Sequence, residues 1–181
     1  EARTNPAVIY TNRGDYENAI AWYQRPLETL RSEEREYLPA ATQAEWREQE
    51  TDIVFNMAQI YQRMDRRADA IRLYREYLAV NPNDATVKTQ LALALAAEGQ
   101  EAEAATMFGE VLNMEGLADD DYYQIGIGLF NAGRFDDAVT AFERAAAANP
   151  LFRDALFNLG QALLAQANAA PEAEQVAIYE R

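Results

Sequence analysis

Residues 133–142 read Gly-Arg-Phe-Asp-Asp-Ala-Val-Thr-Ala-Phe, and the pattern of this stretch occurs twice more upstream. Ala138 has counterparts at Ala104 and Ala70, each 34 residues from the next. The aromatic residue four positions later recurs with the same period, as Tyr74, Phe108 and Phe142. A fixed period of this length is typical of arrays of small units that pack on their neighbours. The sequence therefore predicts a repeat protein, which favours a binding surface over a catalytic centre.

Each unit of 34 residues reads as two helices joined by a short turn. In residues 51–84 the first apolar face has helical spacing, with Val54, Met57, Ala58 and Tyr61 on one side. Asp65-Arg66-Arg67 interrupts the pattern, and a second apolar face ends at Asn81-Pro82, because proline cannot continue a helix. We expect Asp84 to cap the next helix and Gly99 to adopt a positive φ in the next turn.

These units resemble tetratricopeptide repeats. The resemblance rests on Leu156-Phe157-Asn158-Leu159-Gly160 for the start of the first helix and on residues 133–139 for the turn and the second helix. It implies an all-α, right-handed superhelical solenoid of antiparallel helix pairs. It also implies that small residues let the two helices of a unit approach closely. Lys88 and Gly116 depart from the family pattern, in place of a bulky residue and of proline.

The spacing also predicts where the units begin and end. Ala19 precedes Ala70 by 51 residues, one period plus 17, which indicates an insertion. We expect a helix that starts at a capping box, Thr42-x-x-Glu45, and runs into the next unit, while Pro26 kinks the helix before it. The expected organisation is 1–33, a degenerate unit; 34–50, an insertion that extends a helix; 51–84, 85–118 and 119–152, complete units; and 153–181, an incomplete unit.

The ends of the chain suggest a larger parent protein. The sequence begins at Glu1 and not at Met, so we expect a processed form or an excerpt. Val176 and Tyr179 match the beginning of a second helix, after which the repeat stops. Repeat arrays usually end in a unit with a polar outer face, so we expect further repeats beyond Arg181.

Composition excludes several classes of function. The 30 carboxylates and 16 basic side chains give a net charge of −14, so nucleic acid is not an expected partner. The sequence contains no His and no Cys, which excludes His-dependent triads, thiol catalysis and His or Cys metal ligands. We expect no cofactor, no bound metal, no enzymatic activity and no membrane span, and a soluble protein of the cytoplasm or the periplasm.

Two short motifs have a structural interpretation. Asp119-Asp120-Asp121 suits the positive end of a helix dipole better than a cation site, because the spacing of a metal-binding loop is missing. Gly126-x-Gly128 lacks the strand and the third glycine of a nucleotide loop, so we interpret it as a site of close helix packing.

In the family that the chain resembles, first helices line a concave groove that holds peptides or partner helices. The corresponding candidate residues are Phe55, Asn56, Gln59, Gln90, Leu93, Tyr123, Gln124, Ile127, Asn131, Phe157, Asn158 and Gln161. Amides can pair with the main chain of a ligand, and aromatic rings supply affinity. The aromatic side chains at positions 55, 123 and 157 can equally well pack against a neighbouring helix, and both roles remain open here.

The favoured function is a scaffold or adaptor that binds a protein or peptide with basic character or apolar anchors. Residues 85–152 carry eleven carboxylates and three basic side chains, which suits a basic partner or a simple solvated surface. A clamp for acidic C-termini, known in this family, is not expected because the matching positions carry no basic residue. Two alternatives are a subunit that self-associates into a homo-oligomer by repeat stacking, and a regulatory arm of a larger enzyme.

Overall fold

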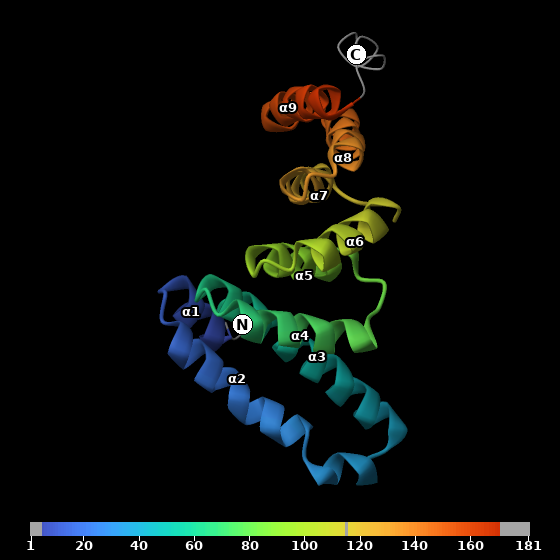
Figure 1. The fold of residues 1–181 in the computed structure, drawn as a ribbon. Coiled ribbons are helices and arrows are strands. Elements are labelled where there is room, and N and C mark those ends of the chain that lie inside the picture. Colours follow the sequence, from blue (N-terminus) through green and yellow to red (C-terminus); the bar gives the residue numbers. More distant parts are fainter. Residues whose placement is uncertain (1–4, 115, 171–181) are drawn as a thin grey trace. The chain divides into compact units, whose positions relative to one another are not determined.

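The computed structural model describes residues 5–114 and 116–170, and over these ranges every regular element is a helix (Figure 1). The chain divides into two compact units, Glu1–Asn83 and Asp84–Arg181. The first contains α1 (Pro6–Asn12), α2 (Tyr16–Leu30), the short 3-10 helix η1 (Glu33–Tyr37), α3 (Ala40–Arg63) and α4 (Arg67–Val80). The second contains α5 (Ala85–Ala97), α6 (Glu101–Leu112), α7 (Asp119–Asn131), α8 (Phe135–Ala148) and α9 (Arg153–Ala169). The predicted all-α fold of helix pairs is confirmed.

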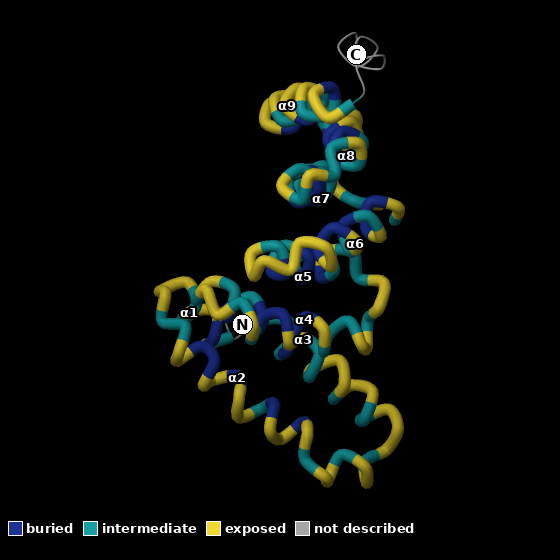
Figure 2. Tube along the Cα trace, viewed as in Figure 1, coloured by how far each residue is buried: buried dark blue, intermediate teal, exposed yellow. Residues whose placement is uncertain are grey.

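Buried positions recur along the helices of both units (Figure 2), and the periodic small and aromatic residues are among them. Ala70, Ala104 and Ala138 are buried, and so are the three aromatic residues four positions after them. Helices that follow each other in the chain pack together: α1 on α2 and α3 on α4 in the first unit, and α5 on α6, α7 on α8 and α8 on α9 in the second. The repeat in the sequence is therefore a repeat of buried contacts, which supply most of the free energy of folding.

Close helix approach explains the two glycines of α7. A Cβ atom at Gly126 would lie 2.6 Å from Cε1 of Phe142 on α8, within the same helix pair. A Cβ atom at Gly128 would overlap the ring of Phe108 on α6, in the preceding pair. Because both rings are buried and cannot move aside, only glycine fits at either position. The interpretation of Gly126-x-Gly128 as a packing motif is confirmed.

The turns within the helix pairs repeat one backbone conformation. Gly99 and Gly133 have φ of +80° and +73°, as the sequence predicts for the first of them. Asp65 occupies the same position in the α3–α4 turn and has φ of +59° without the freedom of glycine. The helix that starts after Asp84 is also capped as expected, because Asp84 accepts a hydrogen bond from the amide of Val87 at 3.0 Å. Asp119, Asp120 and Asp121 form the first turn of α7.

The start of the long helix α3 differs from the prediction. The helix begins at Ala40 after Pro39, so Thr42 lies inside its first turn and caps nothing. Pro39 itself occupies the cap position, with no side-chain hydrogen bond to the first turn. Its ring restricts φ to the value that a chain entering a helix needs, which moves the start forward from the expected capping box. Helix α2 continues through Pro26 to Leu30. Val176 and Tyr179 lie outside the described residues.

Candidate partner-binding clefts

The second unit has a cleft of about 260 Å³ between α5 and α7. Leu93 of α5 and Ile127 of α7 supply large apolar side chains, and Asn131 lies at the end of α7. The remaining lining residues are Ala96, Ala97, Glu101, Ala104, Gly128 and Ala132. The cleft is therefore mainly apolar, with an amide and a carboxylate available for hydrogen bonds. It brings together three of the predicted groove residues.

The first unit has a smaller cleft of about 170 Å³ between α1 and α3. It contains two predicted groove residues, Asn56 and Gln59, together with Arg63 of the same helix. The other lining residues come from elsewhere in the unit and are Val8, Thr11, Asn12, Tyr23 and Ile60. Amide, hydroxyl and guanidinium groups dominate this cleft, so its chemistry is polar where that of the second unit is apolar.

Equivalent repeat positions line the two clefts. Leu93 and Ile127 each stand six residues before their turn glycine, and Val8 stands six residues before Gly14. Asn12 and Asn131 likewise both precede the turn glycine by two residues. Counting backwards from Gly14 would have revealed the α1 residues that the sequence analysis missed. The shared positions mean that the helix pairing itself creates a cleft, and the side chains then set its chemistry.

The three predicted aromatic residues lie in different environments. The ring of Phe55 packs 5.5 Å from that of Tyr77, within its own unit. Tyr123 packs 4.9 Å from Phe152, measured between ring centroids. Phe157 is 67% exposed on α9. Positions 55 and 123 therefore contribute to packing inside the units, whereas position 157 presents a ring to solvent.

The amide side chains are partly committed to internal hydrogen bonds. The Nδ2 atom of Asn158 on α9 donates to the hydroxyl oxygen of Tyr123 on α7 at 3.1 Å, which links two first helices. Asn56 donates to the carbonyl of Asp52 one turn earlier, at 2.7 Å. Both amides keep a carbonyl oxygen that can accept from a ligand.

Gln90 and Gln124 are half-buried, while Gln161 is exposed. Neighbouring Thr89 is buried and donates to the carbonyl of Ala85, so it is not a groove residue.

Burial sets the charge state of the tyrosine in the polar cleft. Removal from water raises the pKa of Tyr23 above its ordinary 10.0, although a hydrogen bond from Asn5 to its oxygen acts in the opposite direction. A phenol with the ordinary pKa is already neutral at physiological pH, so burial only extends to higher pH the range in which Tyr23 keeps its proton as a donor. Arg63, at the end of α3, then supplies the cationic group among the residues that line this cleft.

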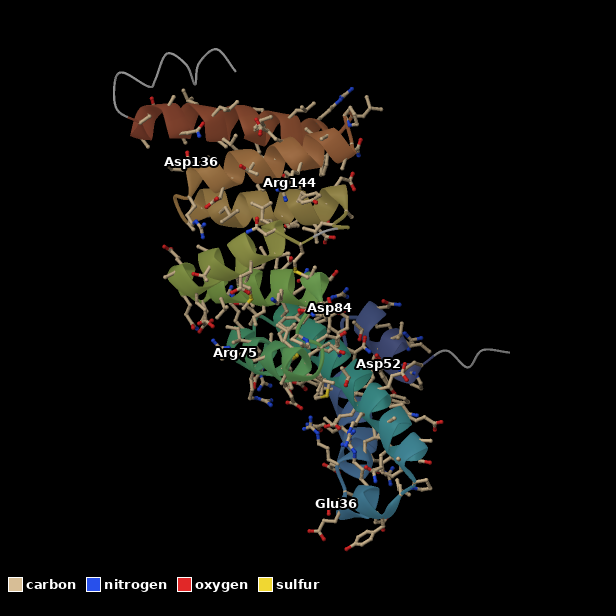
Figure 3. All side chains as sticks on the ribbon, turned by 90° about the vertical axis from the view of Figure 1, so that its right-hand side faces the viewer. Glu36, Asp52, Arg75, Asp84, Asp136 and Arg144 are labelled. Carbon is tan, nitrogen blue, oxygen red and sulfur yellow. The ribbon has the colours of Figure 1, made fainter. Side chains whose placement is uncertain are left out.

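Side-chain hydrogen bonds join successive helix pairs of the second unit at residues that do not line the cleft between α5 and α7. Arg134 donates from Nη1 to the carbonyl of Ala105 on α6 at 2.7 Å, and Gly109 leaves room for its guanidinium. Arg144 of α8 reaches the carbonyl of Leu112 at the end of α6 (Figure 3). Asp136 accepts a hydrogen bond from Gln166 of α9 at 2.7 Å. These bonds link α6 to the start and body of α8, and α8 to α9, and so join successive helix pairs of the second unit.

Metal chemistry and membrane insertion find no support in the described part of the chain. Over residues 5–114 and 116–170, no three His, Cys, Asp or Glu side chains gather in a way that could hold a metal ion. In the same ranges, no helix combines the length and the apolar character that crossing a bilayer requires.

Solved structures share this fold. A crystal structure of MamA aligns over 98% of this chain and 92% of its own, with a TM-score of 0.71 and 17% identity. BtubC (BKLC) from P. vanneervenii aligns over 97% and 74%, with a TM-score of 0.68 and 20% identity. The first TPR of Spaghetti (RPAP3), bound to the HSP90 peptide SRMEEVD, aligns over 67% and 95%, with a TM-score of 0.58 and 19% identity. At these identities the likeness establishes the fold alone.

Sequence comparisons identify the family more specifically than the likeness of folds does. A search of curated proteins finds no match. One model described as a tetratricopeptide repeat matches residues 55–112 and 123–179, and a second matches residues 4–37. Together the matched segments cover most of the chain, between residues 4 and 179. The chain therefore belongs to the tetratricopeptide repeat family.

Proposed function

We propose that this chain is a protein–protein interaction scaffold whose first-helix clefts bind an extended or helical segment of a partner protein. The observation that carries the proposal is the cleft of about 260 Å³ in the second unit, where Leu93 and Ile127 form apolar walls beside the amide of Asn131. An apolar pocket with a few hydrogen-bonding groups is the usual chemistry of a peptide anchor site. Repeats of this family are interaction modules in general, and we propose no chemical step for the chain.

The charge of the second unit supports a partner without acidic character. Residues 84–181 contain 16 carboxylates and five basic side chains, a formal charge of −11. Basic segments are attracted by this field, and the association rate falls as added salt screens it. The preferred ligand is therefore a segment with an apolar side chain for the cleft and basic residues beside it. The remaining candidate residues, Gln90, Gln124 and Gln161 among them, would hydrogen-bond its main chain.

A peptide selection experiment tests the proposal. The intact chain is used to select binders from a random peptide display library, and the affinity of one selected peptide is measured by fluorescence anisotropy. We expect the selected peptides to be enriched in apolar anchors and in Lys or Arg. The substitution Ile127→Asp places a charge in the apolar wall and should weaken binding about fivefold or more, the scale of 1 kcal/mol.

The matched control is Leu151→Asp, because Leu151 is apolar, 87% exposed and not among the residues that line the cleft. Both variants change the charge of the same unit by the same amount. Equal affinities of the two variants, with unchanged melting curves, would show that the cleft is not the binding site. Selected peptides rich in Asp and Glu would contradict the proposed electrostatics.

A second candidate function, self-association, is favoured by the surface of α9. Leu156, Phe157 and Leu164 are each more than 45% exposed on this helix. Contiguous exposed apolar side chains often mark an interface, here one that would stack copies of the array. Light scattering across a hundredfold range of protein concentration tests this candidate. A constant monomer mass would eliminate it, whereas a dimer that Leu164→Gln dissociates would support it.

A further inference from the structure

Residues 31–50 form a feature that the repeat does not explain. They connect α2 to the body of α3 through η1. They contain the 17 residues by which the spacing from Ala19 to Ala70 exceeds one period. The connection is held in place by ion pairs around one carboxylate. Glu50 of α3 accepts from Nε of Arg31 at 2.8 Å and from Nη1 of Arg35 at 2.6 Å. Arg31 also pairs with Glu76, which ties the connection to α4.

Glu50 is ionised over the whole physiological range. Burial works against its charge, but the hydrogen bonds and the charges of Arg31 and Arg35 outweigh burial, and the pKa of the carboxyl falls below its ordinary value. Each carboxylate oxygen of Glu50 therefore faces one arginine, and Glu76 pairs with Arg31 and lies 3.8 Å from Arg72. These arginines partly offset the negative charge of the two carboxylates.

A cleft of about 170 Å³ lies against this cluster, within the first unit. Arg47, Glu50, Thr51 and Val54 of α3 line one wall, at the spacing of one helix face. Tyr77 and Val80 of α4 form an apolar floor, and Val80 is 61% exposed. The helices that form this cleft are α3 and α4, so it is separate from the cleft between α1 and α3 described above.

The rim of this cleft carries unused positive charge. Arg47 has no ion-pair partner among the described residues, and Arg35 uses only one of its guanidinium nitrogens. The lining itself is balanced, with arginines 35 and 47 against carboxylates 50 and 76. Because Arg31 and Arg72 also pair with these two carboxylates, the ion-pair cluster together with Arg47 has four positive and two negative charges. The surplus belongs to this cluster alone, since residues 31–50 as a whole contain six carboxylates and three arginines. Guanidinium groups bind carboxylates with two parallel hydrogen bonds.

We propose that this cleft is a second docking site, which binds an acidic protein segment with one apolar side chain. The apolar side chain would lie on Tyr77 and Val80, and flanking carboxylates would pair with Arg47 and Arg35. This partner chemistry is the opposite of that proposed for the second unit. The array would therefore hold two segments of different charge at the same time.

Fluorescence anisotropy with a defined probe tests the proposal. The probe is the fluorescein-labelled peptide GSEDLLDESG, and the intact chain is titrated against it at low salt. We expect saturable binding that weakens as salt rises. Arg47→Glu should reduce the affinity at least fivefold, and a probe with both leucines replaced by serine should bind more weakly. Arg25→Glu is the matched control, because Arg25 is exposed on α2, lines none of the described clefts and makes the same change in charge.

Val80→Asp provides a second variant, because an exposed side chain tolerates the change without a loss of folding. This variant should also bind the probe with lower affinity. Circular dichroism melting of each variant verifies that the fold is retained. Failure of the wild-type chain to bind the probe, or equal losses in Arg47→Glu and Arg25→Glu, would overturn the proposal. It would also be overturned if Ile127→Asp abolished binding of the probe, or if Arg47→Glu dissociated a dimer, because the occupant would then be a second copy of the chain.

Discussion

The clefts between first helices in the two units share their repeat positions and differ in their chemistry. In the second unit, Leu93 and Ile127 make the cleft apolar. In the first unit, Gln59 and Arg63 of α3 make it polar, at the same distances from the turn residue. Helix pairing and ligand chemistry are therefore set by different residues in this array. The fully buried positions hold the pairs together, and the half-buried cleft positions differ between the two units.

The same contrast extends to charge. Residues 1–83 contain 14 carboxylates and 11 basic side chains, a formal charge of −3, whereas residues 84–181 carry −11. The first unit uses its arginines in ion pairs that hold the connection between α2 and α3. Both units bring their helices together at buried alanines, and the second unit adds the two glycines of α7. The ion pairs around Glu50 are therefore an addition to small-residue packing in the first unit and not a substitute for it.

The largest expected effect concerns the aromatic core of the second unit. Phe142→Ala removes a fully buried ring and should lower the free energy of unfolding by about 3–5 kcal/mol. Because repeats couple mainly to their neighbours, the loss of amide-exchange protection should centre on the second unit. Tyr123→Ala should cost less, since its ring is only half-buried. Uniform loss of protection along the chain would contradict the division into two units.

Glycines at equivalent positions of α7 and α9 allow a matched comparison within the second unit. Gly126→Ala forces a Cβ atom against the ring of Phe142 and should cost about 1–3 kcal/mol. No described atom lies within 4 Å of a Cβ at Gly160, one period later. Gly160→Ala should be neutral or should stabilise by up to about 1 kcal/mol through helix propensity. Urea denaturation of the two variants measures the difference, and similar losses would mean that α9 is packed as tightly as α7.

Tyr74 distinguishes the first unit from the second, where phenylalanine stands at both equivalent positions. Its hydroxyl donates to Oε1 of Gln62 at 2.6 Å, and burial raises its pKa from 10.0 to about 12. The unfolded chain releases this proton at a lower pH than the folded chain does. The stabilisation of the folded chain by the neutral phenol of Tyr74 is therefore fully present below pH 10.0 and is lost as the pH rises towards 12. Tyr74→Phe should remove this part of the alkaline destabilisation.

At neutral pH, the same substitution should cost about 0.5–1.5 kcal/mol for the lost hydrogen bond. Denaturation midpoints of the wild-type chain and of Tyr74→Phe, measured between pH 8 and 11.5, give both quantities. The two curves should converge as the pH rises. Parallel curves would show that the hydroxyl of Tyr74 does not titrate with folding.

The smallest expected effect is at the turn of the first unit. Asp65 has φ of +59°, in the region that glycine occupies at Gly99 and Gly133. Asp65→Gly should relieve backbone strain and raise stability by up to about 1 kcal/mol, partly offset by the greater freedom of the unfolded chain. The ion pair that Asp65 makes with Arg67 is exposed and contributes little. A clear loss of stability in thermal melts would show that the aspartate side chain itself holds the turn.

Periodicity alone determined the fold class and the core of this protein. The series at 70, 104 and 138, and the aromatic series at 74, 108 and 142, specified buried positions because only a repeated contact keeps such residues at a constant spacing. The turns and the cap at Asp84 were equally local, and they followed from glycine, proline and aspartate chemistry. One local prediction was wrong. The capping sequence at Thr42 predicted the start of α3, but the helix begins three residues earlier, with Pro39 at the cap position.

Packing in the folded chain determines which candidate groove residues come together. It placed Leu93 beside Ile127, joined Asn158 to Tyr123, and left the ring of Phe157 in solvent. It also revealed the arginine cluster around Glu50, because residues 31, 35 and 76 have no periodic relation to residue 50. A sequence pattern reports which face of a helix a residue occupies. The distance between faces of different helices depends on packing, and packing is a property of the folded chain.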